Sequence, residues 1–172
     1  MRIDPGSVSL APMTEEDVRR LEEGLATPEG TGEFQWFGFT SSRRFSAKFV
    51  QDGLLGPDGG MFAVRVDGSA VGRVEWFSSS WGRPTSSCWT VAAGIDASRR
   101  GQGIGSLAQR LLVEYLFAGT RAERIQAYTD VDNRAERRAL EQAGFEEEGV
   151  LRRAQWRDGA WHDLVLFSTL RR

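Results

Sequence analysis

The most constraining feature of the sequence is a segment in which a strand pattern runs directly into a helix pattern through glycines. Apolar residues alternate over residues 89–95, which predicts a half-buried strand. From residue 103 to residue 117 the apolar side chains recur every three or four positions, which predicts an amphipathic helix. The connection carries Arg99, Arg100 and the spaced glycines Gly101, Gly103 and Gly105. A strand that feeds a helix in this way favours a layered fold in which the helix covers one face of a sheet.

The remaining patterns predict an α/β (α+β) fold built on one mixed sheet. Asp67-Gly68 and Asp158-Gly159 are hairpin turn signals, and Thr14 and Asn133 are typical helix caps. The expected strands cover residues 7–10, 61–67, 70–78, 89–95, 123–130, 151–156 and 161–170, and the expected helices begin at residue 14 and cover 42–54, 103–117 and 133–143. Because no linker or internal repeat divides the 172 residues, we expect one domain spanning residues 1–172.

The composition excludes several classes of protein. The chain has 22 Lys and Arg against 24 Asp and Glu, a net charge of −2, which disfavours a nucleic-acid partner because such binding rests on many phosphate contacts. Cys88 and His162 are each the only residue of their type, so the chain has no internal disulfide, cysteine cluster or multi-histidine metal site. No apolar run approaches the ~20 residues of a membrane span, and no signal peptide is visible. We therefore expect a cytoplasmic protein with no membrane partner and no metal.

The spaced glycines have the chemistry of an anion-binding loop. Glycines let backbone N–H groups approach a ligand closely, and the first turn of the following helix offers unpaired N–H donors. Such a cradle suits a pyrophosphate. The predicted cofactor contacts here are Arg100, Gly101, Gln102, Gly103, Ile104, Gly105 and Ser106. A Walker A loop would need a lysine in this segment, and a dinucleotide-binding fingerprint would need glycine at Ser106, so both are disfavoured.

At this point the sequence resembles the GCN5-related N-acetyltransferases, the GNAT family. Their acetyl-CoA signature, Q/R-x-x-G-x-G/A, is matched by Arg100, Gly103 and Gly105. The stretch that begins at Asn133 and closes in Gly-Phe at residues 144–145 is similar to the family's second signature, and residues 147–163 resemble its RimJ/RimL-like branch. The resemblance implies one central, mixed, mostly antiparallel sheet with helices on both faces. It also implies a V-shaped splay between the two central strands, 89–95 and 123–130.

The resemblance implies roles for residues on both sides of that splay. The pantetheine arm of acetyl-CoA would enter the gap and pair with the backbone of Ala93, Gly94 and Ile95. Asn133 would contact the cofactor from the opposite side, and capping its own helix is an equally good role for it. The chain departs from the family at position 140, where many members carry a tyrosine that protonates the leaving thiolate and this chain has Leu140. Tyr128 is a weak substitute.

Two carboxylates are candidates for the general base that takes the proton of an amine. Glu75 lies in the strand expected at residues 70–78, which should neighbour the cofactor strand, although an outward-facing position would also explain it. Asp130, at the end of a strand, is the second candidate. The aromatic stretch after residue 30 is expected to line the acceptor site through Trp36 and Phe37, and the loop at 79–84 through Trp81. Packing alone is the alternative explanation for Trp36.

The predicted function is transfer of the acetyl group of acetyl-CoA to a primary amine, by direct attack in a ternary complex. The acceptor would be a small-molecule amine or a peptide or protein N-terminus. Another acyl donor, such as succinyl-CoA, would satisfy the same signatures, and Leu140 leaves open a CoA-binding protein without catalytic activity. A dinucleotide-dependent oxidoreductase is disfavoured by the loop spacing. The apolar terminal hairpin, residues 151–170, permits a homodimer.

Overall fold

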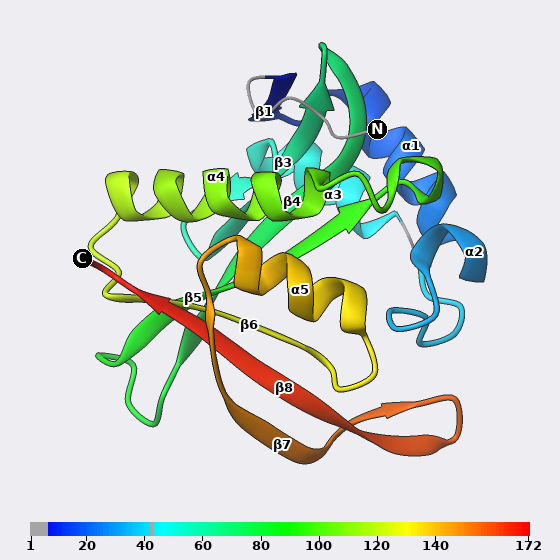
Figure 1. Ribbon diagram of the computed structural model, residues 1–172. Coiled ribbons are helices and arrows are strands. Elements are labelled where there is room, and N and C mark those ends of the chain that lie inside the picture. Colours follow the sequence, from blue (N-terminus) through cyan, green and yellow to red (C-terminus); the bar gives the residue numbers. More distant parts are fainter. Residues whose placement is uncertain (1–6, 42) are drawn as a thin grey trace.

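A computed structural model describes residues 7–41 and 43–172. One open sheet carries all the strands of this part of the chain, with helices on both of its faces (Figure 1). The strands are β1 (Val8–Pro12), β2 (Leu55–Gly56), β3 (Gly59–Val66), β4 (Ser69–Ser80), β5 (Ser87–Ile95), β6 (Arg124–Asp130), β7 (Glu146–Arg157) and β8 (Ala160–Leu170). The α-helices are α1 (Glu15–Leu25), α2 (Pro28–Thr31), α3 (Arg44–Asp52), α4 (Ile104–Gly119) and α5 (Arg134–Gln142).

The sheet has the order β1-β3-β4-β5-β6-β8-β7, with β2 paired to β3. Its pairs are antiparallel except for β5 and β6, which run parallel because α4 crosses over between them. The parallel ladder contains only two pairs, Trp89 with Ile125 and Thr90 with Gln126. On its other edge β5 stays paired with β4 as far as Ile95. The two central strands therefore separate after Thr90, which confirms the predicted splay.

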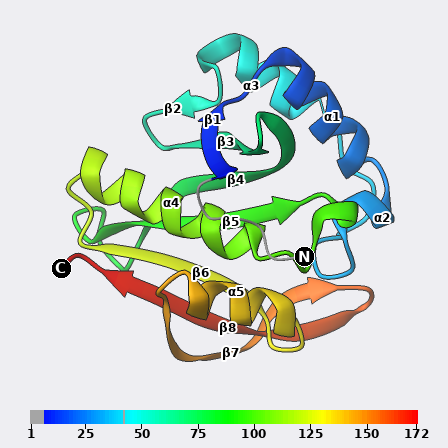
Figure 2. The ribbon, with the colours of Figure 1, turned by 45° about the horizontal axis from the view of Figure 1, so that its top comes forward.

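Different helices cover the two faces of the sheet. The side chains of β3 point alternately to one face and the other, and so belong to two different cores. Phe62 and Val64 belong to the larger core, which they share with buried residues of α4 and α5. Met61 and Ala63, on the opposite face of the same strand, belong to a smaller core under α1 and α3. Figure 2 shows α1 and α3 together beyond β3, and α4 lying along the strands near β5. The splay is thus flanked by a helix pair on each face.

A buried polar cluster holds the point at which β5 and β6 part. Gln126 donates from Nε2 to Thr90 Oγ1 at 3.0 Å, and the hydroxyls of Thr90 and Ser79 lie 2.7 Å apart. The indole of Trp81 donates to Gln126 Oε1 at 2.9 Å. Because Thr90 and Gln126 are buried, unmade hydrogen bonds there would cost about 1–3 kcal/mol each. The cluster therefore fixes the vertex of the splay.

The strand and helix predictions are confirmed in their order, with the following differences. The two-residue strand β2 was not expected, because it is too short for an alternating pattern. Helix α2, a four-residue helix that Thr27 caps and Pro28 begins, was not expected either, because one turn is too short for a periodic signal. β7 begins at Glu146 rather than residue 151, since most of the strand is exposed and has no apolar alternation. The helix expected from residue 42 spans Arg44–Asp52; its predicted start lies outside the described residues. No helix in residues 7–41 or 43–172 has the length and apolar character needed to cross a membrane.

Candidate active site

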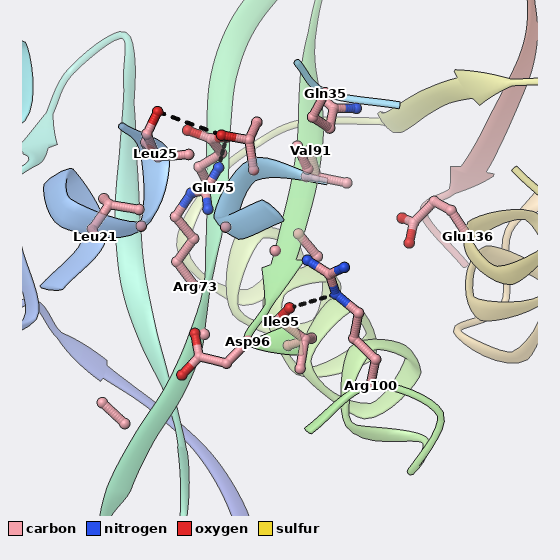
Figure 3. A pocket seen from close by; sticks show the side chains of 18 of the residues that line it. Leu21, Leu25, Gln35, Arg73, Glu75, Val91, Ile95, Asp96, Arg100 and Glu136 are labelled. Atoms are coloured by element: carbon pink, nitrogen blue, oxygen red, sulfur yellow. Dashed lines mark hydrogen bonds and ion pairs between the residues drawn. The ribbon is translucent and has the colours of Figure 1, made fainter. Parts of the chain in front are cut away.

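The splay opens into a cavity of about 190 Å³ that reaches from the edge of β5 to α1 and α2 (Figure 3). Its lining comes from both lips of the V and from both faces of the sheet. The lining residues include Arg73 and Glu75 of β4, Val91–Ile95 of β5 (residues 91–95), Tyr128 and Thr129 of β6, Asn133 and Glu136 at the start of α5, Arg100 after β5, and Leu21, Leu25 and Gln35 from the α1–α2 side. A ligand arm that enters between β5 and β6 would therefore meet side chains of β4.

The structure brings together the residues predicted for the pantetheine side. Ala93, Gly94 and Ile95 all line the cavity, on the part of β5 that has left β6. Strand edges of this kind present N–H and C=O groups in a row, which suits a ligand that carries amides. The guanidinium of Arg73 lies against Gly94, where a Cβ would come within 2.6 Å of Nη1 and displace the end of that side chain.

The predicted pyrophosphate loop follows directly and ends in α4. Gly101 and Gly103 adopt left-handed backbone conformations, with φ of +73° and +81°, so the turn requires glycine at both positions. Gly103 is the N-cap of α4, and no described side chain caps that end of the helix. The first N–H groups of α4 are therefore free for an anion. Gln102, Ile104, Gly105 and Ser106 belong to the same turn and helix start, and Ser106 Oγ also donates to Gln142 of α5 at 3.0 Å.

Arg100 and Asn133 flank the cavity from opposite lips. Arg100 Nε donates to the carbonyl of Ile95 at 2.9 Å, and its guanidinium reaches the turn at Gly32, where a Cβ would lie 3.5 Å from Nη2. Asn133 Oδ1 accepts from the backbone N–H of Glu136 at 3.2 Å and caps α5 as one of its two predicted roles. Its Nδ2 donates to Thr129 Oγ1 at 3.0 Å, which ties the helix start to β6.

Glu75 lies on β4 and lines the cavity beside Arg73 and Leu25 (Figure 3). Its Oε1 is 3.8 Å from Nη2 of Arg73, which stands two residues earlier on the same face of the strand. The side chain of Glu75 is 31% exposed, so the carboxylate is reachable without being fully hydrated. The strand of Glu75 neighbours β5 as expected, and the role of Glu75 as a base stays a prediction.

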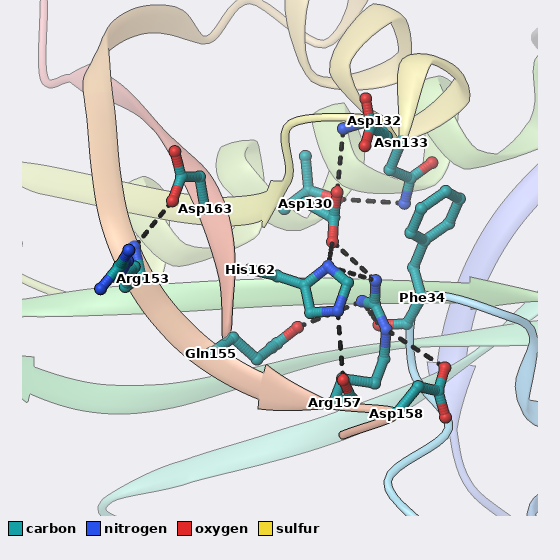
Figure 4. A network of polar contacts seen from close by, with 11 residues as sticks. Phe34, Asp130, Asp132, Asn133, Arg153, Gln155, Arg157, Asp158, His162 and Asp163 are labelled. Carbon is teal, nitrogen blue, oxygen red and sulfur yellow. Dashed lines mark hydrogen bonds and ion pairs between the residues drawn. The ribbon is translucent and has the colours of Figure 1, made fainter. Parts of the chain in front are cut away.

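Asp130, the second candidate base, has a different environment (Figure 4). Its side chain is buried, and Arg157 donates from Nη2 to Oδ2 at 2.7 Å. Burial alone would raise the pKa of Asp130, but the N–H of Asp132 and the charge of Arg157 outweigh it and leave this pKa below its usual value. The carboxylate is therefore held ionised and already bonded. A carboxylate in this state suits the positioning of neighbours better than the acceptance of a proton.

The Asp130 network extends to the acceptor side of the cavity. Arg157 Nη1 donates to the carbonyl of Phe34 at 3.1 Å, and its guanidinium lies 5.3 Å from the centre of the Phe34 ring. His162 Nε2 donates to the carbonyl of Arg157 at 3.1 Å, so in the neutral ring Nδ1 accepts from Arg157 Nη2 at 3.2 Å. Arg157 thus fixes the segment that carries Gln35 into the cavity.

The three predicted acceptor residues are not in the cavity lining. Trp36 packs edge to face on Phe39, with ring centres 5.2 Å apart, and Phe37 is 49% exposed; both follow Gln35, which does line the cavity. Trp81 lies on the β4–β5 hairpin at the vertex, where it bonds Gln126 and faces Arg124 at 5.7 Å. Its place in the vertex cluster is a structural role that local sequence does not reveal.

Comparison with known proteins agrees with this geometry. The family model described as the acetyltransferase (GNAT) domain matches residues 7–146 of the chain. The chain belongs to the GNAT family. A probable N-acetyltransferase of Bacillus subtilis, YjcK, is 38% identical over 76 residues, which are 44% of this chain and 42% of that protein. The matched segment thus spans about two fifths of that curated relative.

Solved structures of GNAT proteins share the fold over nearly the whole chain. RimJ of Mycobacterium smegmatis, in complex with CoA-disulfide, has a TM-score of 0.76 at 23% identity, covering 98% of this chain and 84% of that one. Spermidine N-acetyltransferase of Vibrio cholerae, in complex with CoA and spermine, also has a TM-score of 0.76, at 18% identity and 96% coverage of both chains.

The geometry of this GNAT chain fits acetyl-CoA as its donor substrate. The uncapped start of α4 and the free edge of β5 supply N–H donors where a pyrophosphate and an amide-bearing arm would need them. Among the described residues no cluster of three or more His, Cys, Asp or Glu side chains is arranged to hold a metal ion.

Sequence reasoning missed two groups of this GNAT site. The wall formed by α1 and α2 was not expected, because the first sixty residues carry no family signature. Glu136 was missed because an acid three residues after the cap of a helix is ordinarily explained by capping. Its spacing of four residues from Leu140, a core residue, was the available signal that it faces inward.

Proposed function

We propose that this chain transfers the acetyl group of acetyl-CoA to a primary amine. The observation that carries the proposal is the opening of β5 from β6 into one cavity that also holds the carboxylate of Glu75. A donor held by the glycine turn and by Ala93–Ile95 (residues 93–95) would present its thioester beside that carboxylate. Glu75 would then accept the proton of the attacking amine. An unpaired N–H of β5 would stabilise the oxyanion at the thioester carbonyl.

The charges of the cavity favour an α-amine over a polyamine as the acceptor. Three arginines, Arg20, Arg73 and Arg100, line it together with Asp17, Glu75, Asp96 and Glu136. Arg20 is paired with Asp96 at 3.1 Å, and Arg73 lies near Glu75, so little unneutralised negative charge faces the ligand. A polycation would therefore meet no large excess of negative charge to hold it in the cavity. An α-amine titrates near 8, against about 10.4 for an alkylamine of the lysine type, so it is also the easier nucleophile at neutral pH.

The test is release of CoA from acetyl-CoA in the presence of short peptides with free N-termini, free amino acids and spermidine. We expect turnover to be fastest with the peptides. Glu75→Gln should lower kcat about 100-fold or more, while Glu114→Gln, an exposed carboxylate of α4, should leave it unchanged. A preference for succinyl-CoA would identify another acyl donor. Binding of acetyl-CoA without turnover of any amine would contradict the proposal and support a CoA-binding protein.

A further inference from the structure

The reaction proposed above produces a thiolate that needs a proton. A free thiol has a pKa of about 8.5, so the sulfur of CoA carries a proton at neutral pH once it has left. Transfer of that proton during departure makes the sulfur a better leaving group than a bare thiolate. Position 140, where the resemblance places a tyrosine, is occupied by a leucine that is fully buried in the core between α5 and the sheet. This side chain cannot donate a proton. Another group of the cavity must supply it, or the step goes without an acid.

Glu136 lies one helical turn before Leu140 and lines the cavity on the α5 side, across from Glu75 (Figure 3). Its backbone N–H is bonded to Asn133 Oδ1. In a capping box the backbone N–H of the cap residue donates to the side chain of the third helical residue. Here the N–H of Asn133 donates instead to the carbonyl of Asp130 at 3.0 Å, so Glu136 does not accept from it. The carboxyl of Glu136 is therefore not held by its own cap, and its polar neighbour is Gln109 of α4.

The surroundings of this carboxyl are mostly neutral. From α4 the fully buried Gln109 faces it, and from β6 Tyr128 shares the cavity. Its helical neighbour Arg137 turns away, to the carbonyl of Val131 at 3.0 Å and to Glu147 of β7 at 3.1 Å. The charged groups that share the cavity from other elements are Arg100 after β5, Arg73 and Glu75 of β4, and Asp17, Arg20 and Asp96 on the α1 side.

Burial raises the pKa of Glu136 to about 7, although the side-chain hydrogen bond with Gln109 lowers this pKa in part. A large share of the molecules therefore hold this carboxyl protonated at neutral pH, as a proton donor requires. Glu75 and Glu136 thus form a pair of carboxyl groups on opposite sides of the space for the thioester. A pair of this kind divides the work of base and acid.

We propose that Glu136 is the acid that protonates the CoA sulfur. The inference rests on the proposed acetyl transfer. The amine nitrogen forms a bond to the thioester carbon and gives one proton to Glu75. The carbon–sulfur bond breaks with its electron pair on sulfur, and the Glu136 carboxyl gives its proton to that sulfur. The products are the N-acetylated amine and CoA thiol, and solvent returns Glu75 and Glu136 to their starting states.

The first test needs no turnover and measures the thiol pKa of bound CoA by its thiolate absorbance. An ionised Glu136 beside the sulfur disfavours a second negative charge. Glu136→Gln should therefore lower the thiol pKa so that thiolate forms at about tenfold lower hydroxide concentration than in the wild type. Glu141→Gln removes an exposed carboxylate from the same helix and should leave the value unchanged. An identical thiol pKa in all three proteins would overturn the proposal.

The second test is kinetic, at saturating acetyl-CoA and amine. Glu136→Gln should lower kcat about 100-fold with the KM for acetyl-CoA within about threefold, because an acid acts in the transition state. The wild-type kcat should fall as pH rises above 7, and this limb should be lost in Glu136→Gln. Glu136→Asp, which keeps the carboxyl, should retain part of the rate and covers the case in which the amide variant is unstable. A raised KM with unchanged kcat would make Glu136 only a binding residue and overturn the proposal.

The two tests separate this inference from the proposed function. If no amine is acetylated, the proposed function fails while the thiol titration still reports on Glu136. If the wild type acetylates peptides and Glu136→Gln does so at the same rate, only the role of Glu136 is wrong.

Discussion

The three glycines of the cofactor loop are present for different physical reasons. Gly101 and Gly103 are needed by the fold itself, because their positive φ angles strain any residue that has a Cβ. Gly105 lies inside α4, and a Cβ there would meet only Ile95 Cγ1 at 3.8 Å, an ordinary contact. Nothing in the free protein therefore requires glycine at position 105, and a small residue there leaves room for a ligand close to the helix.

Gly105→Ala should separate stability from binding. Alanine inside a helix is more stable than glycine by roughly 0.5–1 kcal/mol, so the variant should unfold at higher denaturant concentration than the wild type. Its affinity for acetyl-CoA should stay within about threefold of the wild-type value, because the acetyl-CoA signature accepts glycine or alanine at this position. The larger side chain of Gly105→Leu should instead lower the affinity about tenfold or more. Denaturant titration and calorimetric binding measure the two effects. Gly119→Leu, in the last turn of the same helix, should not weaken binding; equal affinity of Gly105→Leu and Gly119→Leu would contradict the assignment.

Because of Glu136, the free energy of unfolding should fall as the pH rises. A carboxylate whose pKa is lowered by folding has the opposite effect. Its pKa rises from 4.5 in the unfolded chain to about 7 in the folded one, so the folded state binds more protons between these values. Stability is therefore lost progressively between pH 4.5 and 7, by about 3 kcal/mol at most. In urea titrations, Glu136→Gln should be more stable than the wild type at pH 8 and equal to it at pH 4. The same difference at both pH values would exclude this cause.

At the scale of elements, the sequence predicted what local chemistry decides. Thr14 and Asp17 form the capping box expected for α1, and Gly144 follows the end of α5 with a left-handed backbone. The cofactor turn was predictable for the same reason, because its function lies in consecutive residues. Contacts between distant segments left no local trace: Arg157 and Phe34 are 123 residues apart. For this reason the acceptor side of the site was predicted only as an aromatic wall.

Arg157 of β7 bonds Asp130 of β6 and the carbonyl of Phe34 after α2. We therefore expect a substitution of Arg157 to affect binding of the amine and not binding of acetyl-CoA. Arg157→Lys keeps the charge beside Asp130 but lacks the planar fork that also reaches the carbonyl of Phe34. We expect a destabilisation of about 1–3 kcal/mol, a KM for the amine that rises several-fold, and an unchanged KM for acetyl-CoA. Steady-state kinetics with both substrates varied measures this. Arg152→Lys, on the exposed part of β7, is the control, and equal changes in both KM values would contradict the prediction.

At the scale of the whole molecule, the site exists because the sheet is incomplete at its centre. Two parallel pairs hold β5 to β6, while β4 and β8 hold the outer edges of these strands over their full lengths. The width of the opening is therefore set at the vertex, by the cluster around Thr90 and Gln126. An Arg124–Glu148 ion pair, with two bonds of 2.6 Å, braces the same end from β7. The residues of the vertex cluster do not line the cavity, so an effect of theirs on binding would be indirect.

Thr90→Val tests whether the vertex controls the opening. Valine has nearly the same shape, but it removes the oxygen that accepts from Gln126 Nε2 and bonds the hydroxyl of Ser79. We expect a loss of about 1–3 kcal/mol in the free energy of unfolding. Because the buried amide of Gln126 must then find another partner, the pairing at Thr90 shifts and the affinity for acetyl-CoA falls several-fold. Thr40→Val makes the same chemical change at an exposed position between α2 and α3, away from the vertex. If both variants bind acetyl-CoA equally well, the splay is set by the outer strands and the vertex contributes stability alone.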